Sequence, residues 1–176
     1  MISLASQVSV NLPHTSDTVS QLAANFASKG LSKTDLAVLS GGHTFGISHC
    51  STIRSRLYNS TGGISIDPTL NSTYAPILIS LCPFNSTTAN VSLDRITPNV
   101  FDFNYYVDIV QNAALFHSDG ALLNDSTTSA YVLGHLLPGS TAVRFLVDFA
   151  NSMLKMSNIL NPATGQVRKN CAVLNS

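Results

Sequence analysis

The chain has 176 residues and a formal net charge of zero; 44% of its residues are hydrophobic and 10% are charged. This length allows one domain with a sizeable core, and the apolar content is too high for a disordered chain. The neutral balance and the scattered Lys and Arg residues argue against a binder of nucleic acid or of an anionic membrane, and no apolar run approaches the ~20 residues of a transmembrane helix.

The first predicted element is a helix over residues 19–26, where apolar side chains recur at helical spacing. Ser16 or Asp17 stands where an N-cap is expected, and Gly30 lies just past the carboxyl end. The sequence therefore predicts a helix that ends before Gly30.

A second helix is indicated by Ser32 and Asp35, which have the S-x-x-D spacing of a capping box before the apolar run "LAVLS". If the chain stays helical past Gly46, four residues further on share one helix face. They are His43, Ile47, Cys50 and Leu57.

A third helix is predicted to start at Asp67 and Pro68, because Asp is a good N-cap and Pro suits the first helical position. The segment carries Leu70, Tyr74, Ile77 and Leu81 at helical spacing. Later helices are expected near residues 103–115, 127–136 and 140–155. The last has a continuous apolar stripe, which consists of Val143, Leu146, Val147, Ala150 and Leu154.

The stretches between the helices, at residues 59–66 and 83–100, are expected to be loops, and the tail from residue 161 is rich in turn residues. The chain contains no repeat, low-complexity tract or linker. The predicted fold class is therefore mainly α, as a single domain over residues 1–176 without an internal boundary.

The stretch "LSGGHTFGISHC" places His43 directly after two glycines. A lone helical histidine is more often a packed core or surface residue than a ligand, so His43 taken alone stays ambiguous. The other histidines show neither H-x-x-x-H nor H-E-x-x-H spacing, which argues against a zinc site. No G-x-S-x-G sequence is present, which argues against a Ser/His/Asp hydrolase.

Five Asn-X-Ser/Thr sequons favour a secreted, glycosylated protein, although Asn and Ser are common on secreted surfaces in general. They are Asn59, Asn71, Asn85, Asn90 and Asn124. The amino terminus has no positive region and no apolar core, so we expect no signal peptide. The three cysteines are an odd number, which leaves one without a partner. Both features suggest that the front of the protein is missing.

Taken as a whole, "DLAVLSGGHTFGISHCSTIRSRLYN" (35–59) closely resembles the proximal haem-ligand signature of secreted plant (class III) haem peroxidases. Five later blocks match that family in order and spacing, so the resemblance covers essentially the entire chain. They are "DPTLNSTYAPILISLCP", "DRITPNVFDFNYY", "LFHSDGALL", "FANSMLKMSNI" and "GQVRKNCAVLN". The resemblance implies the helical fold of these enzymes, haem b as cofactor, and reduction of hydrogen peroxide with oxidation of small phenolic donors.

The resemblance assigns His43 as the axial ligand on the proximal side of the haem iron and Asp119 as the carboxylate partner of its other ring N–H. Such a partner fixes the imidazole tautomer and makes the ligand more electron-donating. The flanking glycines would let the backbone approach the flat macrocycle. Without the family, Asp119 is better interpreted as a turn residue before Gly120.

The resemblance also implies one proximal calcium site built from oxygen ligands, which Ca²⁺ prefers. The matching residues are Thr44, Asp94, Thr97 and Asp102, with a main-chain carbonyl from Val100. Because Thr44 adjoins His43, calcium there would brace the haem ligand. The alternative is that Asp94 and Asp102 cap helices. Ile96, where the family is often basic, touches none of these ligands.

Three further assignments come from the family. Cys50 and Cys82 match one of its disulfides, which would close a loop of about 30 residues and contribute roughly 3–4 kcal/mol. Cys171 matches half of another disulfide and is expected to be unpaired here. Pro13 matches a proline of the channel where aromatic donors bind, although a turn proline is the default interpretation.

The resemblance extends to the proximal half of the family only. The R-x-x-F-H-D-C block that carries the distal histidine and arginine is not found in this sequence. Two functions are therefore expected as alternatives: a truncated haem peroxidase, or an inactive fragment that at most binds haem or calcium. The family implies secretion to the cell wall or vacuole, a monomer, and no nucleic-acid or membrane partner.

Overall fold

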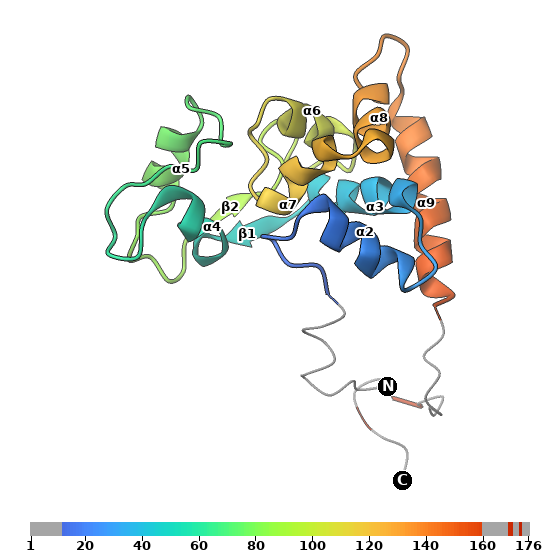
Figure 1. Cartoon of the computed structure of the whole chain (residues 1–176), viewed down its shortest axis with the longest axis horizontal. Helices are drawn as coiled ribbons and strands as arrows, with labels where there is room; N and C mark the ends of the chain where they lie inside the picture. Colours follow the sequence, from blue (N-terminus) through green and yellow to red (C-terminus); the bar gives the residue numbers. More distant parts are fainter. Residues whose placement is uncertain (1–11, 160–168, 171–172, 174–176) are drawn as a thin grey trace.

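The computed structural model describes residues 12–159, 169, 170 and 173 of the chain (Figure 1). Its described part is built from short helices and one small sheet, so the prediction of a mainly α fold is confirmed. Cys171 and most of the predicted turn-rich tail lie outside the described residues. In the described part, no helix is long and apolar enough to cross a membrane.

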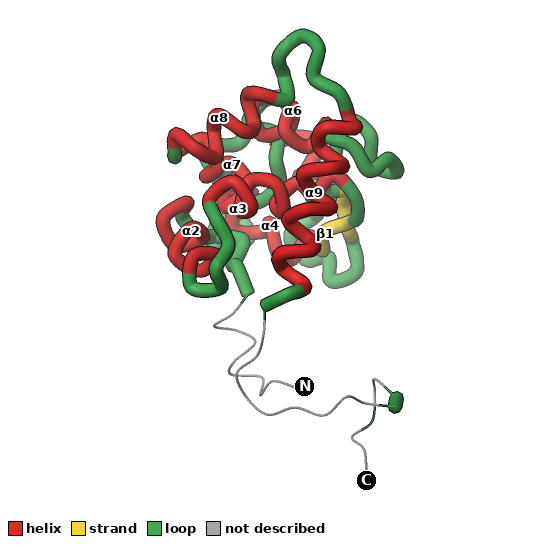
Figure 2. Tube along the Cα trace, turned by 90° about the vertical axis from the view of Figure 1, so that its right-hand side faces the viewer, coloured by secondary structure: helices red, strands yellow, loops and turns green. Residues whose placement is uncertain are grey.

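One core forms where five helices meet around α3 (Lys33–Ser40), and Figure 2 shows α3 between α2 and α9. Its other members are α2 (Val19–Ala27), α6 (Asn104–Val110), α8 (Ser126–Gly134) and α9 (Ala142–Ser157). The predicted capping box of Ser32 and Asp35 is present at the start of α3. The helix before it is capped by Thr18 with Gln21 instead of Ser16 or Asp17.

The chain does not stay helical past Gly46, so the predicted shared face of His43, Ile47, Cys50 and Leu57 is wrong. A 3₁₀ turn, η1 (Gly41–Thr44), is followed by Gly46 at φ +112°, a conformation open to glycine. Strand β1 (Ile47–His49) then pairs antiparallel with β2 (Asn90–Ser92), which lies in a segment predicted as loop. This pairing brings the segments around residues 44 and 94 together.

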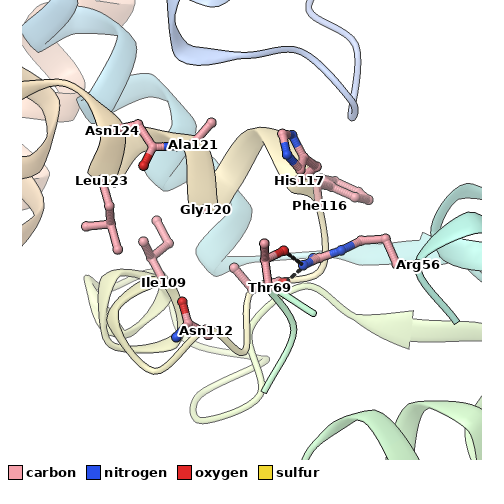
Figure 3. Close-up of a pocket in the computed structure, with 11 residues that line it drawn as sticks. Arg56, Thr69, Ile109, Asn112, Phe116, His117, Gly120, Ala121, Leu123 and Asn124 are labelled. Atoms are coloured by element: carbon pink, nitrogen blue, oxygen red, sulfur yellow. Dashed lines mark hydrogen bonds between the residues drawn. The ribbon is translucent and has the colours of Figure 1, made fainter. Parts of the chain in front are cut away.

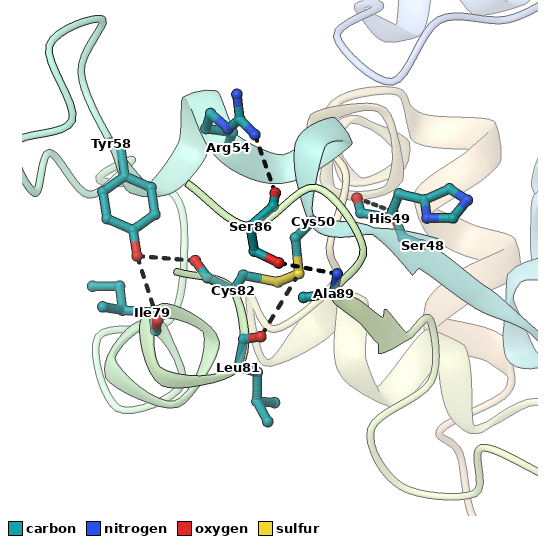
Figure 4. The surroundings of a disulfide bond; sticks show 10 residues. All are labelled: Ser48, His49, Cys50, Arg54, Tyr58, Ile79, Leu81, Cys82, Ser86 and Ala89. Carbon is teal, nitrogen blue, oxygen red and sulfur yellow. Dashed lines mark hydrogen bonds between the residues drawn. A yellow bond between two sulfur atoms is a disulfide. The ribbon is translucent and has the colours of Figure 1, made fainter. Parts of the chain in front are cut away.

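A second core forms between α4 (Cys50–Leu57) and α5 (Ala75–Leu81). The predicted helix start at Asp67 is wrong, because one oxygen of the Asp67 carboxylate accepts from Thr69 in a turn and the other from Arg56. Cys50 and Cys82 form the expected disulfide between α4 and the end of α5 (Figure 4). The Tyr58 hydroxyl donates to the Cys82 carbonyl beside it at 2.9 Å.

The predicted helix over 103–115 ends early, since Asn112 adopts φ +55° just after α6. Two short elements that the sequence did not indicate follow, α7 (His117–Gly120) and η2 (Ala121–Asn124). Helices α8 and α9 occur close to their predicted positions.

The apolar stripe of α9 points away from the described core. Val143, Val147 and Leu154 are 66%, 54% and 63% exposed. The buried face of the helix instead carries Phe145 and Ser152.

Candidate functional site

His43 sits in η1, at the end of the central helix α3, and is held there by tight packing behind it. A Cβ atom on Gly41 would lie 2.5 Å from the Tyr106 hydroxyl and 2.6 Å from the Phe145 ring. Gly41 therefore has no room for a side chain because the core presses against it. The structure gives this glycine a packing role on the core side; the close approach to a macrocycle that the resemblance implies stays a prediction.

The structure brings His43 and Asp119 together, although they are 76 residues apart. His43 Nδ1 lies 2.9 Å from Asp119 Oδ1, and the Asp119 side chain is only 3% exposed. The same carboxylate accepts from the Tyr105 hydroxyl at 2.8 Å and, through Oδ2, from the Phe116 main-chain N–H at 3.0 Å. Asp119 is thus both a turn residue at the start of α7 and the partner of His43.

The electrostatics of the pair follow from this geometry. Burial lowers the pKa of His43, but the hydrogen bond and the charge of Asp119 outweigh it, so that the pKa is raised above its usual value. Burial, together with the charge and hydrogen bond of Asp119, raises the pKa of Tyr105 well above its usual value. Tyr105 therefore remains a neutral donor to Asp119 across the physiological range.

The His43 ring is also fixed in orientation. The Tyr105 and Phe116 rings meet it nearly edge-on, with centroids at 5.8 Å and 5.3 Å. Since Nδ1 faces Asp119, neutral His43 keeps its proton there and presents the lone pair of Nε2 on the other side. Among the described residues, none forms a hydrogen bond with Nε2.

A cavity of about 230 Å³ lies beside His43, whose side chain is 37% exposed. Half of its lining residues are apolar, namely Pro13, Leu22, Phe26, Leu36, Leu39 and Phe116, and the other half are polar, among them His14, Thr15 and Ser118. Pro13 and His43 thus line the same cavity. A nitrogen ligand beside a partly apolar cavity is chemically suited to a flat, largely apolar metal cofactor.

The residues expected to hold calcium also come together. The Thr44 hydroxyl lies 3.0 Å from Asp94 Oδ2 and 3.3 Å from Asp102 Oδ1. The Thr97 hydroxyl lies 3.3 Å and 3.2 Å from the same two oxygens. Asp94 and Thr44 are fully buried. Val100 belongs to the same loop, where its N–H donates to the Thr97 carbonyl at 2.9 Å.

The alternative role of Asp94 and Asp102 as caps also finds support, because each carboxylate accepts hydrogen bonds from main-chain N–H groups. Asp94 Oδ1 accepts from the N–H groups of Ile96 and Thr97, and Asp102 Oδ1 accepts from the N–H of Asn104 at the start of α6. In the described part of the chain, no three His, Cys, Asp or Glu side chains cluster as metal ligands. A cation at this loop would need hydroxyl and carbonyl oxygens as well, which hard cations accept.

A second cavity, of about 180 Å³, shares Phe116 with the first and is shown in Figure 3. At its rim, Arg56 donates to the carbonyls of Ala114 and Leu115 at 2.8 Å and to Thr69. Arg56 thereby ties down the segment that leads into α7 and Asp119. Neither this role nor that of Tyr105 was predicted, because a tyrosine or arginine in the sequence does not reveal where its polar end points.

The sequon asparagines lie at the surface of the described chain. Four are exposed: Asn59, Asn85, Asn90 and Asn124. Asn71 is only partly exposed, and its side-chain amide donates to the Gln111 carbonyl at 2.8 Å.

Comparison with known proteins adds to this geometry. A family model described as Peroxidase matches residues 2–135. "Peroxidase 5" of Vitis vinifera is 42% identical over 179 residues, covering 99% of this chain and 54% of the relative. "Peroxidase 27" of Arabidopsis thaliana is 40% identical, covering 94% and 52%. The chain thus spans about half the length of these two relatives. A "Peroxidase" of Lupinus polyphyllus is 40% identical, covering 93% and 99%.

Proposed function

Because the chain belongs to the peroxidase family, we propose that it forms the proximal half of a haem-dependent peroxidase. The enzyme would reduce hydrogen peroxide while small phenolic donors are oxidised. The observation that carries the proposal is the His43–Asp119 pair, with its 2.9 Å contact and its Nε2 on the side away from Asp119. When bound, haem b supplies the redox chemistry.

His43 would hold the haem iron through Nε2, and Asp119 would keep the other ring nitrogen protonated. A carboxylate acceptor makes an imidazole a stronger donor to a metal. Tyr105 limits this effect, since its hydroxyl shares Asp119 Oδ1 with His43 and takes up part of the negative charge. The strength of electron donation by His43 therefore depends on how strongly Asp119 hydrogen-bonds to His43 and how strongly it hydrogen-bonds to Tyr105.

The cavity beside His43 would receive part of the cofactor. Its apolar residues, such as Leu22, Phe26 and Leu36, support this role, and Pro13 would border the path of an aromatic donor. The pocket could accept a phenol because its apolar residues suit an aromatic ring while its polar residues could hydrogen-bond a hydroxyl.

Calcium would bind to Thr44, Asp94, Thr97, Asp102 and the Val100 carbonyl. In the described chain, no ion pair joins Asp94 or Asp102 to a Lys, Arg or His. Two carboxylates that share only neutral donors repel one another, and a divalent cation would remove this repulsion. Since Thr44 follows His43, the bound cation would hold the iron ligand in place.

The remaining expectations concern the whole protein. We propose the secreted or vacuolar compartment on account of the family, and the sequons favour secretion, with Asn59, Asn85, Asn90 and Asn124 accessible to modification. We also propose a monomer that acts on small molecules alone. Peroxide activation would need a general acid and base on the haem face opposite His43, which contributes typically 10²–10⁴-fold to the rate.

The test is a haem titration of the purified chain, followed by its Soret absorption. We expect one haem per chain with a histidine-ligated spectrum, lost in His43→Ala and kept in His117→Ala, which removes an exposed histidine outside the first cavity. Equal spectra for His43→Ala and the parent chain would overturn the ligand assignment. Turnover of a phenol no faster than with free haem would favour the alternative, an inactive fragment that binds haem or calcium.

A further inference from the structure

Arg95 follows Asp94 directly, yet its side chain is engaged elsewhere. Its main-chain N–H donates to Asp108 Oδ2 at 2.9 Å, and its Nε donates to Asp108 Oδ1 at 3.0 Å. One residue thus holds both oxygens of this carboxylate. The guanidinium also donates to Gln111 Oε1 and lies over the Tyr74 ring, 5.5 Å from its centroid. The positive charge nearest in sequence to Asp94 is therefore already paired.

The pair has little freedom to rearrange. The Asp108 side chain is 1% exposed and that of Arg95 is 38% exposed. Removing one partner of such a pair leaves a buried charge uncompensated, which is strongly unfavourable. The segment around residue 95 is therefore fixed to helix α6.

Helix α6 also contacts the other carboxylate of the candidate calcium loop, which belongs to Asp102. Asp102 accepts from the N–H of Asn104, the first residue of α6, and Asp108 lies one turn further along the same helix. Arg95 thus connects the neighbour of Asp94 to the helix that Asp102 caps. The ion pair therefore fixes one end of the loop of residues 94–102 to α6, and the hydrogen bond between Asp102 and Asn104 fixes the other end to the same helix.

We propose that Arg95 and Asp108 form a clamp. Both are positioning residues that set the spacing between Asp94 and Asp102, and through it the affinity of the loop for a divalent cation. The inference rests on the calcium site proposed above. Without the clamp, the two carboxylates are joined only through neutral groups, such as the hydroxyls of Thr44 and Thr97, and their spacing is less firmly fixed in the metal-free chain. Cation binding would then have to bring them together again, and ligand sets that are not held in advance bind more weakly.

The experiment compares Asp108→Asn and Arg95→Gln with a matched control, Lys155→Gln. Lys155 is likewise an exposed cation on a buried carboxylate, with 58% exposure against 4% for Asp35, but the pair lies in a different part of the fold. Calcium affinity is measured for the 176-residue chain by calorimetry and by Tb³⁺ luminescence. We expect both clamp variants to bind about 10-fold more weakly or worse, as for other residues that orient metal ligands, and the control to bind as the parent does.

Thermal unfolding with chelator and with calcium separates positioning from mere structural support. A variant with a purely structural defect has equally lowered unfolding midpoints in chelator and in calcium, so that the increase caused by calcium is the same as in the parent. This result would overturn the proposal that Arg95 and Asp108 position the ligands. If a variant is unfolded in chelator, the calcium concentration that restores folding gives its affinity only after correction for the free energy of folding of the metal-free variant. Arg95→Lys keeps the main-chain donor and the charge, and should recover part of the affinity.

The failure of the calcium site itself has a different signature. A parent chain whose unfolding midpoint does not respond to calcium, and which does not sensitise Tb³⁺, would refute the site and with it the clamp. A parent that responds while both clamp variants respond equally would refute the clamp alone.

Discussion

His43 and Thr44 are consecutive residues, but their side chains enter two sites of opposite electrostatic character. His43 meets Asp119, whose charge is shared among the imidazole, the Tyr105 hydroxyl and a main-chain N–H. Thr44 meets the two carboxylates of Asp94 and Asp102, which have only neutral donors in the described chain. Asp119 thus has a titratable partner in His43, whereas Asp94 and Asp102 have none among the described residues, and the proposed calcium ion would supply the missing positive charge.

Helix α6 connects the two sites. Its first turn is capped by Asp102, while Tyr105, in the same helix, donates to Asp119. A cation that fixes the start of α6 would thereby also fix the donor that tunes the partner of His43. The contrast between the sites predicts that removing a carboxylate has opposite effects in the two places.

The largest effect is expected at Asp119. Asp119→Ala leaves the Tyr105 hydroxyl and the Phe116 N–H buried without their acceptor and removes the partner of His43. We expect the free energy of unfolding to fall by about 3–5 kcal/mol, as for other broken buried pairs. Urea denaturation at constant pH measures this loss, and Asp119→Asn, which keeps one acceptor, should lose less.

At the loop, the same kind of change should stabilise the metal-free chain or leave it unaffected. Asp94→Asn removes one of two facing carboxylates, so repulsion falls while the acceptor oxygen for Ile96 and Thr97 remains. The parent should gain about 2.7 kcal/mol when calcium is present at 100 times its dissociation constant, and the variant should lose this gain. Unfolding with chelator and with calcium provides the measurement. A destabilised Asp94→Asn in chelator would contradict the contrast between the sites.

Tyr105→Phe removes one hydrogen-bond donor from Asp119, so that this carboxylate becomes more similar to those of Asp94 and Asp102. Loss of a hydrogen bond to a charged group should cost about 1.5–3 kcal/mol. The freed negative charge would act more fully on His43, so its pKa should rise further. NMR titration of the His43 ring in the cofactor-free chain detects this, and Tyr106→Phe is the control because its hydroxyl donates to the Ala37 carbonyl. An unchanged His43 pKa in Tyr105→Phe would show that Asp119 is not shared.

Local signals in the sequence predicted local structure in some places and failed in others, such as the helix start expected at Asp67. The capping box of Ser32 and Asp35 needs only four residues, and it is present. Strands β1 and β2 have three residues each, too few for an alternating pattern, so they were missed. The contact between His43 and Asp119 spans 76 residues, and only the resemblance to a family indicated it.

The α9 stripe shows the limit of periodicity. Its spacing correctly indicated a helix with an apolar face, but Val143 and Leu154 are exposed on the described molecule. Periodicity reports that a face is apolar, and it does not report whether this chain covers it. Phe145 lies off the stripe and is fully buried, because the opposite face of α9 packs against α3 and Gly41.

The smallest effect is expected at His135, whose imidazole is buried more deeply than that of His43. His135 is 1% exposed and, unlike His43, has no carboxylate partner: Nδ1 lies 3.0 Å from the Tyr131 carbonyl, and Nε2 has no partner among the described residues. Burial lowers the pKa of His135, with a smaller opposing contribution from that carbonyl, so the unfolded chain binds a proton more readily than the folded one. Its stability contribution is therefore constant above the unfolded pKa of about 6.5 and falls as the pH drops below it.

His135→Phe tests this sign. Phenylalanine keeps the contacts with Tyr106, Tyr131 and Phe145 and cannot be protonated. Arg144 and Asp148 of α9, the charged groups that influence His135, stay in place. The variant should become more stable relative to the parent as the pH falls below the unfolded pKa, and should be nearly equal to it at pH 8. Because His43 has the opposite shift, its contribution is full at pH 5 and lost as the pH rises through its raised pKa. Equal differences between variant and parent at both pH values would show that His135 takes no part in the acid response.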